Sequence, residues 1–400
     1  MPSITLKPGR ERSLLRRHPW IFSGAVLRVD DGIVPGSTID IISSVGEYVA
    51  RAAYSPQSQI CARVWTFADE AVDAGFFRRR IRSALQVRRL LQIEALTDSF
   101  RLVHAESDRL PGLVVDRYGE TLVMQFLTAG AVYWSQTLTD LLAEETGLNC
   151  IYERSDADVR DLEGLPSQSG WLRGSTANGA PTDPRVEIVE HGLKFVVDVA
   201  QGHKTGFYLD QRENRKRVRE LSHGREVLDC FCYTGGFTVN ALAGGAQSVL
   251  AVDSSADALR LAAENMSLNG MDSTAADLIE GDVFQVLRRL RDQGRSFDMV
   301  ILDPPKFAPT AAFADKAARG YKDINLLAFK LLRPSGILVT FSCSGGIDAA
   351  LFQKIVAAAA LDAGAEAQIL DHLGQASDHP VAMEFPEGTY LKGLVILKVS

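Results

Sequence analysis

Four short apolar runs in the second half of the chain each end on a side chain that can take part in chemistry. Three runs end on an acid and one on a thiol, namely Asp229, Asp253, Asp303 and Cys343. Buried parallel strands appear in a sequence as short continuous apolar runs, and open α/β sheets bind ligands at the carboxyl ends of their strands. The sequence therefore predicts a crevice where carboxylates and a thiol meet, which suits a nucleoside-type cofactor beside a nucleophile.

Glycines follow the first of these acids at the predicted turn into a helix. Thr234, Gly235 and Gly236 form a small-residue loop that lets the backbone approach a ligand closely. The loop lacks the G-x-G-x-x-G spacing of dinucleotide-binding proteins, which disfavours a dehydrogenase. Asp253, which follows Asp229 by 24 residues, is placed to accept hydrogen bonds from both ribose hydroxyls.

A further acid, Asp282, closes the next predicted strand, where it can accept a hydrogen bond from an adenine amino group. Any one of these acids is explained equally well as a helix cap or a turn residue. Three acids at the ends of consecutive strands favour a nucleoside site over three unrelated caps.

The segment 303–306, Asp-Pro-Pro-Lys, forms a rigid corner because two prolines fix its backbone. Such a corner can hold a planar base by its amino edge. Most cysteines are inert and buried, but Cys343 is flanked by serines and a glycine, which favours a reactive thiol at the mouth of a strand. We expect Cys230 and Cys232 to pack around the cofactor loop instead.

The length of 400 residues predicts two or three domains. No apolar run is long enough to span a bilayer, and the first residues lack the apolar stretch of a secretion signal, so we expect a cytoplasmic enzyme. The five cysteines are odd in number and scattered, which argues against a disulfide framework. A C-x-C pair without a second ligand pair does not predict a metal site.

The charge is distributed unevenly. The net charge is −7, but residues 1–92 hold 14 basic and 8 acidic side chains, a balance of +6, which leaves −13 for the remainder. A first basic cluster consists of Arg10, Arg12, Arg16, Arg17 and His18. A basic face that contacts phosphates is one interpretation. For the second cluster, residues 78–89, a solvated helix face is the alternative, because its arginines alternate with apolar residues.

Three regions follow from the patterns along the chain. Residues 1–75 alternate short apolar runs with turns, which predicts a small β-barrel. Residues 76–183 combine a connector helix with a small α+β unit, within which 164–184 is expected to be a long loop or linker. Residues 184–400 alternate strands and helices, which implies a parallel sheet with crossover helices, and 393–399 is its last strand.

Taken together, these runs resemble the class I S-adenosylmethionine-dependent methyltransferases. Further segments look like those of the 23S ribosomal RNA cytosine-C5 methyltransferase family, namely 203–212, 229–237, 303–307, 319–325 and 341–345. Other segments look like the PUA domain and the middle domain of that family, namely 18–24, 101–118 and 152–156. The resemblance covers the whole chain and implies an α/β fold, a Rossmann-like methyltransferase domain preceded by a PUA β-barrel and a small α+β domain.

The resemblance also implies a cofactor, a partner and roles for residues. S-adenosylmethionine is the expected cofactor and 23S ribosomal RNA the expected partner, with the first basic cluster contacting the RNA. The cofactor contacts that the resemblance implies are Gln211, Asp229, Phe231, Tyr233, Thr234, Gly235, Asp253, Asp282 and Asp303. It implies Cys343 as the nucleophile that adds to C6 of cytosine, and Asp303 as the group that orients the base.

Other features of this mechanism are left open by the sequence. Lys306 and Lys322 are candidates for the cation that helps Cys343 to ionise. Lys306 stands where many RNA cytosine-C5 enzymes have a second cysteine, so the group that removes the C5 proton is open. His379 is one candidate, and a structural turn histidine is its alternative.

Two other functions are weighed against this one. A methyltransferase acting on a base amino group needs no cysteine but usually has an aromatic residue directly after the two prolines, where this chain has Lys306. A non-catalytic RNA-binding assembly factor would not need the acids and Cys343. The oligomeric state is open, and a homodimer is compatible with the sequence.

Overall fold

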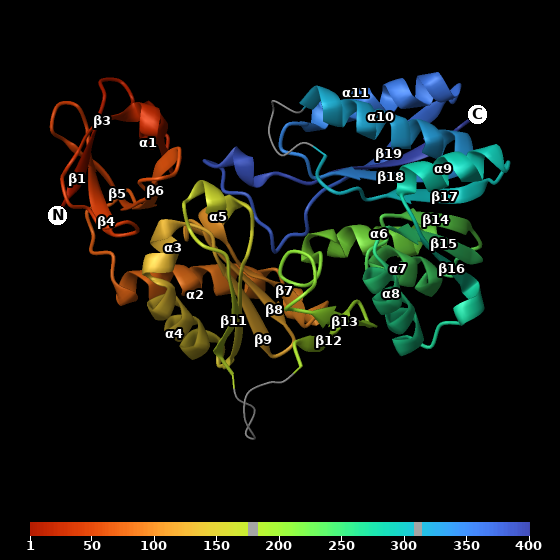
Figure 1. The fold of residues 1–400 in the computed structure, drawn as a ribbon, viewed down its shortest axis with the longest axis horizontal. Coiled ribbons are helices and arrows are strands. Elements are labelled where there is room, and N and C mark those ends of the chain that lie inside the picture. The colour runs from red at the N-terminus through yellow and green to blue at the C-terminus, as the bar shows by residue number, and fades with distance from the viewer. Residues whose placement is uncertain (175–182, 308–313) are drawn as a thin grey trace. The chain divides into compact units, whose positions relative to one another are not determined.

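A computed structural model describes residues 1–174, 183–307 and 314–400 (Figure 1). The chain divides into two compact units. Unit 1 comprises Met1–Gly192, Val197–Leu209 and Ser377–Gly388, and unit 2 comprises Leu193–Val196, Asp210–Ala376 and Thr389–Ser400. Each unit is therefore built from segments that are distant in the sequence.

The first part of unit 1 is a six-stranded sheet in the order β2-β6-β5-β4-β1-β3. Its strands are β1 (Ser3–Leu6), β2 (Trp20–Phe22), β3 (Val26–Val29), β4 (Thr38–Ile42), β5 (Tyr48–Tyr54) and β6 (Ile60–Thr66), and the short helix α1 (Arg12–Leu15) follows β1. Alternate residues of β1 and β4, such as Ile4, Ile39 and Ile41, are fully buried and form part of one apolar core. This alternation is what a sheet with one buried face requires.

The second part of unit 1 is a five-stranded sheet in the order β11-β10-β9-β8-β7. Its elements are α2 (Ala74–Leu90), β7 (Ser99–His104), β8 (Leu113–Tyr118), β9 (Thr121–Phe126), α3 (Ala129–Tyr133), α4 (Ser135–Thr146), β10 (Cys150–Ser155), α5 (Val159–Leu162) and β11 (Gln168–Arg173). Asp73 begins α2 by accepting a hydrogen bond from the Phe76 amide at 2.8 Å. Phe76, Phe77 and Ile81 of this helix are buried in the core beneath the sheet.

The expectation of a continuous loop over 164–184 is wrong for residues 168–173. These residues form β11, which pairs with β10 in antiparallel fashion, and the rings of Tyr152 and Trp171 pack 4.9 Å apart. Pairing with a neighbouring strand outweighs the Gly- and Ser-rich composition that predicted a loop. Residues 175–182 of the predicted loop lie outside the described residues.

Strands β12 (Arg185–Glu190) and β13 (Leu193–Asp198) form a two-stranded sheet. His191 and Gly192 connect them with positive φ angles of 46° and 78°. A two-residue turn with both φ angles positive matches the twist of paired strands.

Unit 2 is built on a seven-stranded sheet in the order β16-β15-β14-β17-β18-β20-β19. Its strands are β14 (Glu226–Cys230), β15 (Ser248–Asp253), β16 (Ala276–Glu280), β17 (Phe297–Leu302), β18 (Leu332–Ser342), β19 (Ala367–Leu373) and β20 (Lys392–Lys398). Its helices are α6 (Arg212–Leu221), α7 (Gly236–Ala243), α8 (Ala256–Leu268), α9 (Val283–Asp292), α10 (Ala314–Leu331) and α11 (Ala349–Ala363). Helices α9, α10 and α11 cover one face of the sheet, and α6, α7 and α8 lie on the other (Figure 1).

Strands β14 to β18 are mutually parallel, as the alternation of strands and helices predicts. The expectation of a parallel sheet is wrong for the last strand, because β20 is antiparallel to both β18 and β19. No crossover helix separates β19 from β20, so the chain enters the sheet from the opposite end. β20 thereby fills the position between two strands that precede it in the sequence.

Candidate active site

The strand order of unit 2 reverses at β14. β15 and β16 lie on one side of it, and β17 and β18 lie on the other. Ligands of open α/β sheets bind at such a switch point, outside the carboxyl ends of the strands. Asp229 and Asp253 lie in the last two residues of β14 and β15, and Asp303 and Cys343 directly follow β17 and β18. The structure thus brings these four residues to one edge of the sheet, while Asp282 lies two residues after β16.

The loop after β14 is held in an unusual backbone conformation. Phe231, Tyr233 and Gly235 have φ angles of 63°, 49° and 78°. Left-handed backbone in non-glycine residues costs on the order of 1 kcal/mol and persists only where the surroundings impose it. A Cβ atom at Gly235 would lie 2.9 Å from the Cβ of Ala262, so no larger residue fits there without displacement. The side chain of Asn265 holds the loop by donating to the Thr234 carbonyl at 2.9 Å.

Asp253 supports this loop from the neighbouring strand. Its Oδ2 accepts a hydrogen bond from the Tyr233 amide and its Oδ1 from the Ser255 amide, both at 2.9 Å. A carboxylate has about four lone-pair positions, so Asp253 retains acceptor capacity toward a ligand. Asp282 accepts from the Gln285 amide at 2.9 Å and begins α9. For both acids, the structural role that the sequence offered as an alternative is therefore present.

Asp229 is the most strongly perturbed acid of the site. It is fully buried, and burial raises its pKa to about 7, with a further contribution from the negative charges of Asp303 and Asp253. Its Oδ2 accepts a hydrogen bond from the Thr238 hydroxyl at 2.7 Å. Its Oδ1 is buried without a hydrogen-bond partner in the described part of the chain. A buried oxygen of this kind costs free energy unless a donor reaches it, so it fits a site that receives a cationic or hydroxyl-bearing ligand.

Gln211 lies at the start of α6 and is buried. Its Oε1 accepts a hydrogen bond from the side chain of Asn214 at 2.5 Å, and the same Asn214 amide donates to the Gly374 carbonyl at 2.9 Å. The adjacent Asp210 accepts from the Tyr390 hydroxyl at 2.6 Å. The predicted contact Gln211 is therefore held by Asn214, which is itself held by the Gly374 carbonyl, and its neighbour Asp210 is held by Tyr390.

Cys343 lies in the turn after β18 and is half-buried. Next to it, the Ser344 hydroxyl shares a hydrogen bond of 2.9 Å with the Tyr321 hydroxyl of α10. Burial raises the pKa values of Cys230 and Cys232 well above the ordinary value, and negative charge from Asp229 adds to this effect. Those two thiols remain protonated, in agreement with the packing role expected for them.

Lys392 is a residue of this site that the sequence analysis missed. It is the first residue of β20 and lies opposite Ser342 in the antiparallel pairing with β18. Its Nζ donates to the carbonyls of Ser344 at 2.9 Å and Tyr390 at 2.8 Å. Burial lowers the pKa of Lys392, and the Cys343 thiol raises it in the opposite sense. The one signal in the sequence is a lysine directly before an apolar strand, which does not reveal a neighbour 49 positions earlier.

Two candidates from the sequence have other surroundings in the structure. Lys322 forms an ion pair of 2.7 Å with Asp362 of α11, so its partner is a carboxylate. Lys306 is exposed and contributes to the electrostatic environment of Lys392. His379 is buried in unit 1, with its Nδ1 atom 3.3 Å from the Asp378 carboxylate, which supports the interpretation as a structural turn histidine.

The basic residues of unit 1 differ in how they are paired. Arg10, Arg12, Arg16 and Arg17 are exposed, and His18 contacts Glu387 at 3.3 Å. In the second cluster, four arginines of α2 are paired with acids: Arg78 and Arg82 with Glu145, Arg79 with Glu70, and Arg88 with Asp108. Ion pairs within the chain thus account for most of the second cluster, which the sequence analysis described as a basic or solvated face.

Two other kinds of site are absent from the described residues. Among the described residues, no helix combines the length and apolar composition that a membrane crossing requires. The same residues contain no group of three or more His, Cys, Asp or Glu side chains arranged to hold a metal ion.

Comparisons with known proteins place this geometry in a family context. The sequence model of an S-adenosylmethionine-dependent methyltransferase family matches residues 167–380, and that of a PUA-like domain matches residues 4–67. The chain is 52% identical over 393 residues to a ribosomal RNA large subunit methyltransferase I of Shewanella amazonensis, with 98% of each chain covered. It is also 52% identical over 396 residues to the protein of that name from Aeromonas hydrophila, again with 98% of each covered.

Solved structures share the fold at low sequence identity. A SAM-dependent methyltransferase from Streptococcus mutans has a TM-score of 0.84 at 20% identity and covers 99% of this chain and 100% of its own. A methyltransferase complexed with SAH has the same TM-score at 21% identity, with the same coverage. At this level of identity the likeness establishes the fold alone.

Proposed function

The chain belongs to the family of ribosomal RNA large subunit methyltransferases I, S-adenosylmethionine-dependent enzymes with a PUA-like domain, and on this premise we propose that it methylates C5 of a cytosine in 23S ribosomal RNA. The observation that supports the cytosine chemistry is the position of Cys343. The thiol directly follows β18, at the same edge of the sheet as Asp229, Asp253 and Asp303. Methylation of a base amino group needs no thiol at this position.

The residues around the loop after β14 fit the cofactor. The buried Oδ1 of Asp229 and the buried hydroxyl of Thr234 have no hydrogen-bond partner within the described residues, and Gly235 lets the loop pack directly against Ala262 of α8. We assign the adenosine and methionine parts to Gln211, Asp229, Phe231, Tyr233, Thr234, Gly235, Asp253, Asp282 and Asp303. When bound, S-adenosylmethionine supplies a methyl group on a positively charged sulfur. The carboxylates of the site favour that charge.

Cys343 performs the activating step. Its thiolate adds to C6 of cytosine, forming an S–C6 bond and placing the displaced electron pair on the C5 side of the ring, so that C5 becomes nucleophilic. After C5 has gained its methyl group, removal of the C5 proton restores the C5–C6 double bond and expels Cys343 as a thiolate. Asp303 accepts a hydrogen bond from the base amino group and holds the ring in plane.

Two lysines favour the thiolate form of Cys343. Lys392 is half-buried beside the turn that contains Cys343 and is fixed by two carbonyls, so its charge acts at a defined position. Lys306, on the corner after β17, adds a second positive charge to the same region. Cation-stabilised thiolates are the reactive form of cysteine in other enzymes.

The test is transfer of labelled methyl groups from S-adenosylmethionine to 23S ribosomal RNA that lacks its own modifications, with the wild type and Cys343→Ala compared. The expected product after digestion is 5-methylcytidine, formed by the wild type and absent with the variant. RNA containing 5-fluorocytidine should trap a covalent complex with the wild type, because fluorine cannot leave as the C5 proton does. A methylated amino group in the product, or activity that survives in Cys343→Ala, contradicts the proposal.

A further inference from the structure

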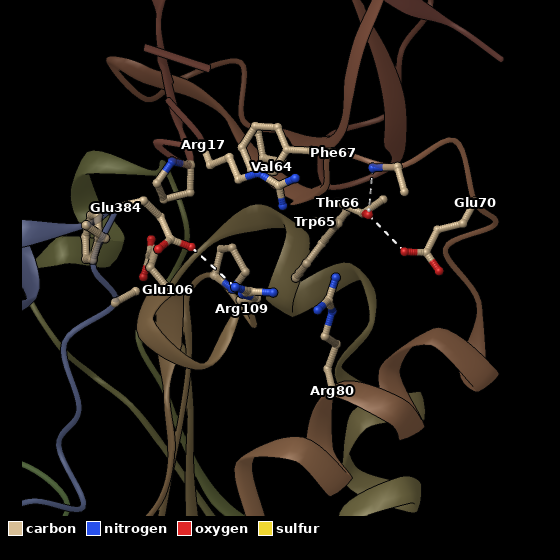
Figure 2. A pocket seen from close by; sticks show the side chains of 15 residues that line it. Arg17, Val64, Trp65, Thr66, Phe67, Glu70, Arg80, Glu106, Arg109 and Glu384 are labelled. Carbon is tan, nitrogen blue, oxygen red and sulfur yellow. Dashed lines mark hydrogen bonds and ion pairs between the residues drawn. The ribbon is translucent and has the colours of Figure 1, made fainter. Parts of the chain in front are cut away.

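A pocket in unit 1 is lined by none of the residues assigned to the cofactor or to catalysis above. It has a volume of about 240 Å³ and is bounded by the end of β6, the first turns of α2, the turn before β8 and residues 382–385. Three arginines from three different elements, Arg17, Arg80 and Arg109, point into it (Figure 2). Its volume is below the ~300–1,000 Å³ of sites for drug-sized ligands, which favours one small charged group over a large cofactor.

Two of the three acids of the pocket, Glu106 and Glu70, have partners other than its three arginines. Glu106 accepts a hydrogen bond from the Trp20 indole at 2.8 Å and lies 3.6 Å from Arg63, which is outside the pocket. Glu70 forms an ion pair of 2.6 Å with Arg79 and accepts from the Thr66 hydroxyl at 2.9 Å. Glu106 and Glu70 are therefore bound to groups other than the three arginines, and among the described residues Glu384 is the pocket acid that forms an ion pair with one of them, Arg109.

The arginines are less completely engaged. Within the part of the chain that the structure describes, the side chains of Arg17 and Arg80 form no hydrogen bond and no ion pair, and Arg109 has one long ion pair, 3.6 Å to Glu384. The contacts of the first two are with aromatic rings: Arg17 lies 6.0 Å from the ring centre of Phe67, and Arg80 lies 5.0 Å from that of Phe76. A guanidinium on a ring keeps its donors free for a second, planar or tetrahedral acceptor.

The surroundings of Arg80 disfavour the charged form of its side chain. The side chain is half-buried, and burial lowers its pKa, with a smaller contribution from the neighbouring Arg109. Two guanidinium groups that repel each other at the edge of a pocket are stabilised when an anion lies between them. Arg78 and Arg79 of the same helix are already paired with carboxylates, so an added anion would stabilise them less.

We propose that this arginine pocket, formed by Arg17, Arg80, Arg109 and the ring of Phe67, binds a phosphodiester group of the substrate RNA. A phosphate offers the oxygens that paired guanidinium groups bind in bidentate fashion, and Phe67 offers a face for the adjoining base. The inference rests on the proposed function, since the RNA substrate supplies the phosphate. It adds Arg80 and Arg109, from the second part of unit 1, to the basic cluster of the first part.

The test measures equilibrium binding of an unmodified 23S ribosomal RNA transcript at several KCl concentrations. Arg80→Gln should weaken binding on the order of tenfold, and the slope of log affinity against log salt should become shallower by about one, as for one lost phosphate contact. Arg89→Gln is the matched control, because Arg89 is on the same helix but about 13 Å along its axis and on the opposite face. It should change neither quantity.

Three readouts separate the outcomes. If the wild type binds RNA and Arg80→Gln changes neither the affinity nor the slope, the phosphate site in the pocket is refuted and the proposed function is unaffected. If Arg80→Gln and Arg89→Gln lose the same affinity, the phosphate site is refuted as well. A wild type that does not bind RNA contradicts the proposed function itself. Binding of S-adenosylmethionine and the thermal midpoint show whether Arg80→Gln is folded, and Arg17→Gln, a substitution at an exposed position, provides the same test if it is not.

Discussion

Lys392 and Cys343 show how much of this site depends on contacts between distant residues. The acids and the thiol could be predicted because each follows an apolar run, and parallel strands bring their ends together. The role of Lys392 could not be predicted from the sequence, because its place beside Cys343 follows from the antiparallel pairing of β20 with β18. A local pattern predicts where a strand ends, but not which strand lies beside it.

The electrostatic role proposed for Lys392, stabilisation of the Cys343 thiolate, predicts a change in the pH dependence of methylation. Lys392→Gln should slow single-turnover methylation at pH 7 on the order of tenfold, and the loss should shrink as the pH rises, because the thiolate then forms without help from the cation. Lys392→Arg should restore part of the rate.

Lys398→Gln is a control on the same strand. Lys398 is also partly buried and donates to two carbonyls, those of Phe329 and Leu332. Lys398→Gln should lower folding stability about as much as Lys392→Gln does, without altering the pH profile of methylation. A rate loss in Lys392→Gln that is constant from pH 6 to pH 9 would contradict the role assigned to Lys392.

Burial of Asp229 predicts a loss of folding stability that grows as the pH rises. Its pKa is about 7 in the folded chain, against an ordinary value of 3.8. Between these values the folded state binds the proton and the unfolded state does not, so the free energy of unfolding falls as the pH rises from about 4 to about 7. In the absence of cofactor, Asp229→Asn should remove this dependence. Urea unfolding of both proteins at pH 5 and pH 8 measures it: the wild type should lose stability relative to the variant at pH 8, and an equal difference at both pH values refutes the argument.

At the scale of elements, the loop between β14 and α7 tests whether backbone shape supports the cofactor site. Gly235→Ala should reduce the affinity for S-adenosylmethionine and lower stability by more than about 1 kcal/mol, because it adds both a left-handed alanine and a Cβ atom 2.9 Å from Ala262. Gly270→Ala, with φ of 65° and no atom within 4 Å of the added Cβ, isolates the backbone cost. Calorimetric titration with the cofactor compares the two variants. Similar affinities in both would show that the close contact with Ala262 is unimportant.

The elements also show where sequence patterns fail. The apolar runs of β14, β15, β17 and β18 predict buried strands because both faces of the sheet are covered. Strand β11, Gln168–Arg173, has no apolar run of the kind that marks a buried strand, and its pairing with β10 makes it a strand. Similarly, the arginine pocket joins elements that local periodicity cannot place side by side.

At the scale of the whole molecule, a buried polar network gathers distant segments into unit 1. The Arg101 guanidinium donates to both carboxylate oxygens of Asp116 at 2.8 Å, and the Thr205 hydroxyl donates to the same acid at 2.6 Å. The Arg101 amide donates to Asp378 at 2.8 Å. The segments 197–209 and 377–388 are thereby tied to the central sheet.

Replacement of Asp116, the acid at the centre of this network, should lower the free energy of unfolding. Burial alone raises the pKa of Asp116, but Arg101 outweighs this effect and the net pKa is lowered. Asp116→Asn leaves a buried guanidinium without its charge partner and should lower the free energy of unfolding by about 3–5 kcal/mol at pH 7. The difference should shrink as the pH falls below the ordinary value of 3.8, because the unfolded wild type takes up the proton first and the folded wild type, whose pKa is lowered, takes it up at a still lower pH.

Urea unfolding of Asp116→Asn beside Asp140→Asn measures this cost. Asp140 forms its ion pair with Arg173 at the surface of the same unit, so its loss should cost less than about 1 kcal/mol. Equal destabilisation by the two substitutions would show that the network contributes no more than a surface pair.

The late insertion of β20 has a consequence for biosynthesis. During translation, β18 and β19 emerge from the ribosome before the strand that separates them, so both are held with unpaired edges and are open to association with other chains. The same strand delivers Lys392 to the neighbourhood of Cys343. A nascent chain can therefore complete its cofactor loop early, but Cys343 gains the neighbouring charge of Lys392 only after residues 392–398 have been made. Chains that stop before this point should be captured by chaperones.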